Sequence, residues 1–162
     1  MIHSFSPIVG LQPRVLILGS MPSVKSLEAH QYYGHPRNQF WTIMMDLTGV
    51  DRSLAYDERV TFIKQHPVII WDVLKSCERE GSLDTAIRNE EPNDIQGLLD
   101  QHPTLEVIVL NGGKAAQSFK KACPDLVGRE DLILLTMPST SPAYTLPLEE
   151  KLKAWRRLIP WL

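Results

Sequence analysis

The stretch Val15-Leu16-Ile17-Leu18-Gly19-Ser20-Met21-Pro22-Ser23 joins a wholly apolar run to a polar turn. The run Val15–Leu18 is rich in β-branched residues, which is typical of a strand covered on both faces, and the glycine, serine and proline after it end the strand. Open parallel sheets bind ligands at the edge where their strands end. We therefore expect the turn after Leu18 to contribute to a site.

Three further short apolar runs predict three more strands, at Val68–Trp71, Val107–Leu110 and Leu132–Leu135. Segments with helical periodicity alternate with them and predict helices at Phe40–Leu47, Asp57–Gln65, Ile95–Asp100, Ala115–Ala122 and Leu148–Leu158. No hairpin dipeptide lies between the predicted strands, so the pattern favours an α/β fold with a four-stranded parallel sheet flanked by helices. Right-handed crossovers would place all four strand ends along one edge.

The segment Ser76–Asp94 is rich in charged residues and turn formers. We interpret it as a surface excursion with one helical turn near Leu83–Arg88, followed by a helix that starts at Asp94. The chain has 162 residues, which is enough to bury a single core, and we expect one domain over residues 1–162.

Several classes of protein are disfavoured by composition. The sequence has neither a leader-like segment nor an apolar run long enough to span a bilayer, so we expect a soluble, cytoplasmic protein. Cys77 and Cys123 lack the spacing of a disulfide framework or a zinc site. The net charge of −2 disfavours non-specific coating of nucleic acid. It leaves open an enzyme that grips a few phosphates through backbone N–H groups.

The segment Asn111-Gly112-Gly113-Lys114 follows a predicted strand and precedes a predicted helix. Its N–H groups could face an anion, although it matches neither the GxGxxG nor the Walker spacing, and a plain strand-to-helix turn is an equal alternative. The side chain of Asn111 can donate and accept hydrogen bonds together, which suits reading the edge of a base.

Two loops carry further candidate side chains. The loop Met137–Tyr144 is dense in hydroxyls and prolines, which offer small donors on a stiff backbone, yet Ser139 is not in a nucleophile elbow. Tyr32 and Tyr33 lie in a loop bounded by glycine and proline, where one ring could stack on a base, and core packing is the alternative for either.

Three motifs together resemble one known family. Gly19-Ser20-Met21-Pro22, Tyr33-Gly34-His35-Pro36-Arg37-Asn38-Gln39-Phe40-Trp41 and Met137-Pro138-Ser139-Thr140-Ser141-Pro142-Ala143 are similar to motifs of the uracil-DNA glycosylase superfamily, specifically its hypoxanthine-DNA glycosylase branch. The resemblance runs from about Val15 to Trp155 in order and spacing. It implies a three-layer α/β/α fold with a four-stranded parallel sheet, and excision of deaminated bases from DNA.

Two positions depart from the main uracil enzymes of that family. Where those enzymes carry a polar residue that positions or activates water, this chain has Met21, whose thioether can do neither. The hypoxanthine branch also lacks that polar residue and relies on a later asparagine, which matches Asn38. The last motif begins with Met137 in place of a histidine that would stabilise a uracil anion, whereas a departing purine can be protonated on its ring.

The resemblance implies a role for each motif. Asn38 would orient the attacking water, Tyr33 would stack on the flipped base, and Asn111 would bond its polar edge, while the other residues would line the base pocket (Gly19, Ser20, Met21) or hold phosphates and probe the duplex (Pro22, Ser23, Ser139, Thr140, Ser141, Pro142). We expect a monofunctional glycosylase that leaves an abasic site, acts on DNA containing deaminated bases, associates with the nucleoid while doing so, works as a monomer, and needs no metal or cofactor.

Other functions remain open on the sequence. One is a mismatch-type glycosylase for uracil or xanthine. Another is a module that binds a mononucleotide or phosphate through Gly112, Gly113 and Lys114 without catalysis. A third is a protein that binds damaged DNA and leaves it uncut.

Overall fold

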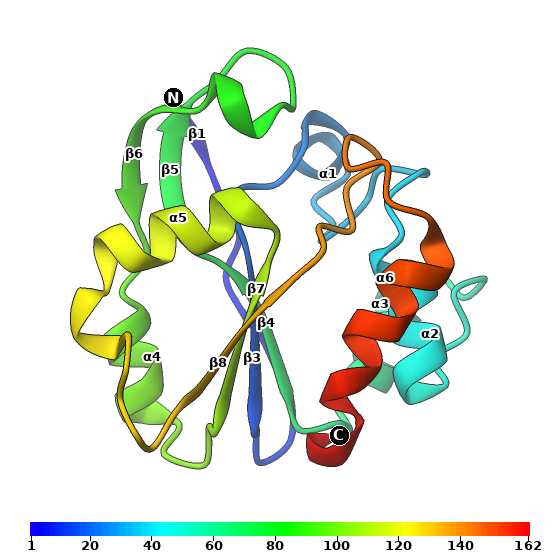
Figure 1. Cartoon of the computed structure of the whole chain (residues 1–162). Coiled ribbons are helices and arrows are strands. Elements are labelled where there is room, and N and C mark those ends of the chain that lie inside the picture. The colour runs from blue at the N-terminus through cyan, green and yellow to red at the C-terminus, as the bar shows by residue number, and fades with distance from the viewer.

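The computed structural model describes residues 1–162 and is built around a five-stranded sheet (Figure 1). The strands lie in the order β2-β4-β3-β7-β8, with bounds Ile8–Val9 (β2), Val68–Asp72 (β4), Val15–Gly19 (β3), Val107–Asn111 (β7) and Ile133–Met137 (β8). The four predicted strands are present and pair in parallel. The short strand β2, which the sequence analysis missed, adds an antiparallel edge to β4.

The helices cover the two faces of this sheet (Figure 1). One face carries α2 (Phe40–Thr48), α3 (Tyr56–Ile63) and α6 (Leu148–Trp155), and the other carries α4 (Ile95–Gln101) and α5 (Gly113–Ala122). The predicted helix at Leu148–Leu158 is shorter than expected, because the chain continues from Arg156 to Trp161 as a 3₁₀ helix, η3, that contains Pro160. The predicted start at Asp94 is confirmed, since its side chain caps α4 by accepting from the Gly97 N–H.

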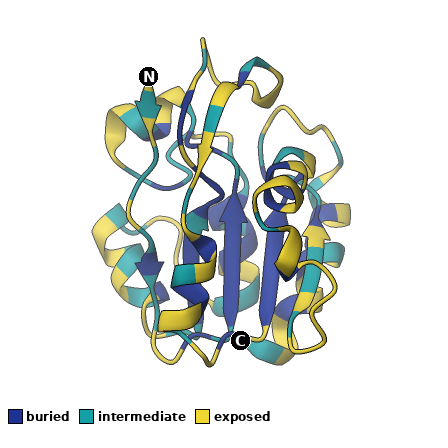
Figure 2. Ribbon diagram, turned by 90° about the vertical axis from the view of Figure 1, so that its left-hand side faces the viewer, coloured by how far each residue is buried: buried dark blue, intermediate teal, exposed yellow.

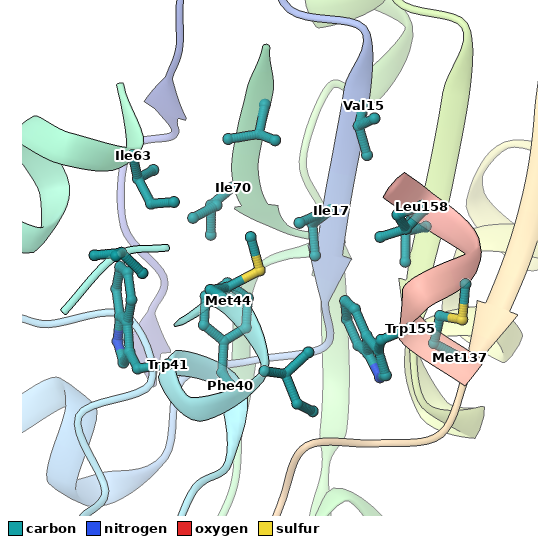
Figure 3. Close-up of a cluster of buried hydrophobic side chains, with 14 of the residues drawn as sticks. Val15, Ile17, Phe40, Trp41, Met44, Ile63, Ile70, Met137, Trp155 and Leu158 are labelled. Atoms are coloured by element: carbon teal, nitrogen blue, oxygen red, sulfur yellow. The ribbon is translucent and has the colours of Figure 1, made fainter. Parts of the chain in front are cut away.

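Alternation along the central strands divides the core into two layers. Ile17 points into one layer, where Phe40, Met44 and Trp155 pack, as Figure 3 shows. Leu16 and Leu18 point into the other, against α4 and α5. Both layers are apolar, so the central strands are buried along their length (Figure 2). This burial explains why each strand reads as a continuous apolar run.

The surface excursion predicted for Ser76–Asp94 contains two strands that the sequence analysis missed. The chain forms strands β5 (Leu74–Glu78) and β6 (Arg88–Pro92), which pair antiparallel with each other, and β5 also pairs with β1 (Ile2–His3) to complete a second, three-stranded sheet. The single turn expected near Leu83–Arg88 is present as η1 (Asp84–Ala86). The hydrophobicity pattern does not reveal these strands, because most of their side chains are polar and exposed. Only Leu74, Ser76 and Cys77 of the two strands are buried.

Two short helices complete the fold: α1 (Val24–Ala29), which the sequence analysis did not predict, and the 3₁₀ helix η2 (Pro124–Leu126). No helix is long and apolar enough to cross a membrane. No group of three or more histidine, cysteine, aspartate or glutamate side chains is arranged to hold a metal ion.

Candidate active site

A cleft of about 410 Å³ opens at the carboxyl edge of the large sheet. Its walls come from the loops after β3 and β8, which meet above the sheet in Figure 1, from the ends of β4 and β7, and from the turn between β5 and β6. Parallel pairing of β3, β4, β7 and β8 brings these ends together. The cleft lies where the strand order predicts a ligand site.

The cleft gathers almost every residue that the sequence analysis singled out. The predicted residues in its lining are Asn38, Tyr33, Asn111, Gly19, Ser20, Met21, Pro22, Ser23, Ser139, Thr140 and Ser141. Of the residues that the resemblance assigns to the site, only Pro142 lies outside the lining; Gly112 and Lys114, considered for a mononucleotide site, also lie outside it. Segments that are more than 100 residues apart in the chain therefore meet at one place.

Asn111 ties two walls of the cleft together. Its Nδ2 donates to Tyr33 Oη at 3.2 Å and to Thr140 Oγ1 at 3.1 Å, while its Oδ1 accepts from the Thr140 N–H at 3.0 Å. An amide oxygen has two lone pairs, so Oδ1 retains one acceptor site. The predicted contact of Asn111 with a base edge would have to use this site or exchange one of the internal bonds.

Tyr33 and Tyr32 have different surroundings, and Tyr33 is the better candidate for stacking on a base. The ring of Tyr33 stacks on Phe40 with centroids 3.9 Å apart and an interplanar angle of 7°, which leaves its other face for a ligand. Tyr32 also touches the cleft but is only 4% exposed and packs in the core, where its hydroxyl donates to Ser6 O at 2.8 Å. The backbone of Tyr33 has φ +56°, a left-handed conformation that turns the chain between these two rings.

Asn38 lies two residues before the first residue of α2 and has a structural partner. Its Oδ1 accepts from the Phe40 N–H at 2.9 Å and so satisfies one of the free donors at the helix start. A second lone pair on Oδ1 remains for water. The predicted water-orienting role is therefore compatible with the bond that fixes the side chain.

The phosphate-binding prediction for Ser23 meets a competing local role. Its Oγ caps α1 by accepting from the Ser26 N–H at 3.2 Å.

Met21 is 8% exposed and packs against the core layer under α4 and α5. On the opposite wall, the buried Lys151 donates from Nζ to Tyr144 O at 2.8 Å and so fastens the loop after β8 to α6.

Gly112 allows the loops after β7 and β8 to approach each other. Its φ of +97° and ψ of 173° belong to a region that essentially only glycine adopts, and a Cβ there would lie 2.9 Å from Ser139 Cβ. We expect Gly112→Ala to lower the free energy of unfolding by about 1–3 kcal/mol, measured by urea denaturation. The neighbouring Gly113→Ala is the matched control, because a Cβ there meets nothing within 4 Å. Equal stabilities of the two variants would contradict this prediction.

Sequence reasoning missed Asp72, the last residue of β4. It is 4% exposed and lines the cleft, and its Oδ2 has no hydrogen-bond partner. Burial, followed by the negative charge of Asp84, raises the pKa of this carboxyl to about 7, against a smaller opposing effect of Arg79. The only signal in the sequence is one acidic residue directly after the apolar run Val68–Trp71.

The hairpin adds a wall that the sequence analysis did not assign to the site. Ser82, Leu83, Asp84 and Thr85 line the cleft, and Ser20 Oγ donates to Asp84 Oδ1 at 2.7 Å. Lys114, by contrast, is outside the lining, and its Nζ lies 2.7 Å from Glu90 Oε1 in a half-buried ion pair. A mononucleotide-binding function would need the Lys114 ammonium group to bind phosphate, and here that group is already paired with Glu90.

Comparisons with known proteins agree on one family. Residues 7–161 match the family model described as Uracil DNA glycosylase superfamily. A protein of Methanosarcina barkeri named hypoxanthine DNA glycosylase is 36% identical over 154 residues, which cover 94% of each chain. A Methanosarcina acetivorans protein of the same name is 39% identical over 116 residues, or 71% of this chain and 73% of that one.

A solved structure has the same fold. The solution NMR structure of a Methanosarcina acetivorans protein, described as a candidate uracil DNA glycosylase, superposes with a TM-score of 0.83 at 31% identity. The match covers 97% of this chain and 95% of that chain.

Proposed function

The chain belongs to the uracil-DNA glycosylase superfamily, and from that premise we propose that it hydrolyses the N-glycosidic bond of hypoxanthine in DNA and leaves an abasic site. The observation that carries this proposal is the convergence of the Gly19–Ser23 turn, Asn38 and the Ser139–Ser141 loop on one cleft. The names of the two Methanosarcina relatives support hypoxanthine as the base.

The cleft has room for a base but not for a stacked duplex, so the target nucleotide has to leave the helix. Flipping costs a few kcal/mol and is least costly for a poorly paired base such as hypoxanthine. The uncovered face of Tyr33 would stack on the flipped base, with a contribution of about 1–3 kcal/mol. The free lone pair of Asn111 Oδ1 would accept from the polar edge of the base.

Asn38 would hold the attacking water through the second lone pair of its Oδ1. The water oxygen bonds to C1′ of the deoxyribose while the bond from C1′ to the base nitrogen breaks. An amide is too weak a base to remove a proton outright, so its contribution is to place the water against a sugar that develops positive charge.

The lining of the cleft contains no lysine. A lysine or amino-terminal amine is the group that would attack the sugar to form a Schiff base. Its absence from the lining supports simple hydrolysis, with water as the only nucleophile. We therefore propose a monofunctional glycosylase.

We expect the protein to release free hypoxanthine from a duplex that carries one deoxyinosine. The assay uses matched duplexes that contain deoxyinosine, deoxyuridine, deoxyxanthosine or no lesion. Products are scored as alkali-labile sites in the labelled strand and as free base by chromatography. Under enzyme excess, the inosine duplex should be cleaved fastest.

Each other outcome points to a different function. Faster release of uracil or xanthine would identify a different base specificity within the same family. Tight binding of inosine DNA with no released base would identify a protein that binds damage without cutting. Neither release nor preferential binding of any damaged duplex at enzyme excess would overturn the proposal.

A further inference from the structure

Asp72 is a buried carboxyl that the hydrolysis described above does not use. It ends β4 beside Gly19, its register partner on β3, at the floor of the cleft. Its Oδ2 is buried and receives no hydrogen bond from the protein. A buried carboxylate oxygen without a partner is costly, so this environment favours the protonated, neutral form of the Asp72 carboxyl.

The Asp72 carboxyl and the Tyr33 hydroxyl both lie close to one point above Gly19. An added Cβ on Gly19 would lie 2.6 Å from Asp72 Oδ1 and 3.0 Å from Tyr33 Oη, so both side chains reach the same small space above Gly19. Tyr33 is the predicted stacking residue. A base that stacks on Tyr33 would therefore have an edge near the Asp72 carboxyl.

The charged and titratable groups around Asp72 favour its neutral form. The negative charge of Asp84 disfavours a charged Asp72 carboxylate, and the positive charge of Arg79 favours it by a smaller amount. Arg79 is engaged elsewhere, since its Nη2 donates to Pro22 O at 2.6 Å. The pKa values of Tyr33 and Tyr32 are raised, first by burial and then by the charge of Asp72, so both hydroxyls remain neutral. With a pKa of about 7, Asp72 holds a proton in a large share of the molecules near neutral pH.

We propose that Asp72 is a general acid that protonates the departing purine. The proposal rests on the glycosylase function proposed above and deepens it. A purine leaves readily when a ring nitrogen takes up a proton, and N7 is the ring nitrogen that Asp72 would protonate. No histidine lines the cleft to perform this step.

The proton moves from the Asp72 carboxyl to N7 of the base, and the electron pair of the bond between C1′ and N9 moves into the purine ring. Water adds to C1′ and loses one proton to solvent. The products are neutral hypoxanthine, an abasic sugar and the Asp72 carboxylate, which is protonated again from solvent.

The test compares wild type with Asp72→Asn on inosine DNA in single-turnover reactions between pH 5 and 9. For wild type, the rate constant should fall as pH rises through the pKa of about 7, because the acid form is lost. Asp72→Asn should lower the rate about 100-fold or more and remove this decline. Asp84→Asn should move the midpoint of the decline to lower pH, because it removes the charge that raises the pKa of Asp72.

Folding and binding controls separate an acid from a structural residue. A carboxyl whose pKa is raised in the folded state destabilises that state increasingly as pH rises from the unfolded value toward the folded one. Asp72→Asn should therefore melt at an equal or higher temperature than wild type at pH 8. Its affinity for a duplex with uncleavable 2′-fluoro-deoxyinosine should stay within threefold of the wild-type value.

The outcomes are distinguishable. Failure of wild type to release hypoxanthine at any pH overturns the proposed function and the acid with it. Release by wild type at a rate that rises with pH, or an Asp72→Asn variant that keeps the wild-type rate and pH profile, overturns only the role of Asp72. A carboxylate that merely accepts a hydrogen bond from the base would give the rising profile.

Discussion

Asn38→Ala is expected to lower the single-turnover rate of hypoxanthine release by roughly 10²- to 10⁴-fold. The amide is the side chain in the cleft that the family resemblance assigns to the attacking water, and Phe40 N–H holds its Oδ1 in place at 2.9 Å. Alanine removes both the water partner and the geometry. The measurement is release of free base from inosine DNA with enzyme in excess, so that product release does not limit the rate.

A structural side effect of Asn38→Ala has to be separated from the loss of chemistry. Removal of the acceptor at the start of α2 should cost about 1 kcal/mol of stability. Asn38→Asp keeps a carboxylate oxygen for Phe40 N–H and for water, so it should fold like wild type and retain much of the activity. An alanine variant that stays folded and releases hypoxanthine within threefold of the wild-type rate would exclude Asn38 from water positioning.

The large sheet could be predicted because its three central strands, β4, β3 and β7, are buried on both faces. These strands appear in the sequence as apolar runs, as does β8 as far as Leu135, and the predicted helices show a one-sided periodicity. The parallel order then predicts that the loops after β3, β7 and β8 meet. The location of the cleft follows from these facts alone, which is why separated motifs could be assigned to one site.

The hairpin could not be predicted in the same way. Strand β6 reads Arg-Asn-Glu-Glu-Pro, and every residue in it is exposed or half-buried, so it is specified by pairing with β5 rather than by a hydrophobic face. The strands β1 and β2 have two residues each, which is too short for any period to be recognised. Tertiary pairing therefore determines these elements, and with them the wall from Ser82 to Thr85.

The role of individual side chains in the site depends on burial, which the sequence does not reveal. Tyr32 and Tyr33 are adjacent and chemically identical and both reach the cleft lining, yet Tyr32 is buried in the core and only the Tyr33 hydroxyl contacts Asn111. Asp72 appears in the sequence as an ordinary polar strand end. Its unusual pKa arises from burial and from Asp84, which comes from the hairpin that the sequence did not indicate.

Gly19→Ala is expected to reduce the rate of base release by about 100-fold, because the added methyl group enters the cleft floor and displaces groups that need a fixed geometry. The Cβ would lie 2.6 Å from Asp72 Oδ1 and 3.0 Å from Tyr33 Oη, and both distances are shorter than ordinary contact. Overpacking of this kind costs about 1–3 kcal/mol, so the melting temperature should fall by roughly 2–12 °C.

A double-mutant cycle tests whether the contact with Asp72 is the cause. Asp72→Ala removes the carboxyl that the methyl group would meet, so Gly19→Ala should lower the melting temperature less in that background than in wild type. Additive changes in melting temperature would place the strain elsewhere in β3. A Gly19→Ala variant with wild-type stability and rate would show that Asp72 and Tyr33 move away from the added methyl group at little cost. Contact between a bound base and Asp72 at a fixed position would then be excluded.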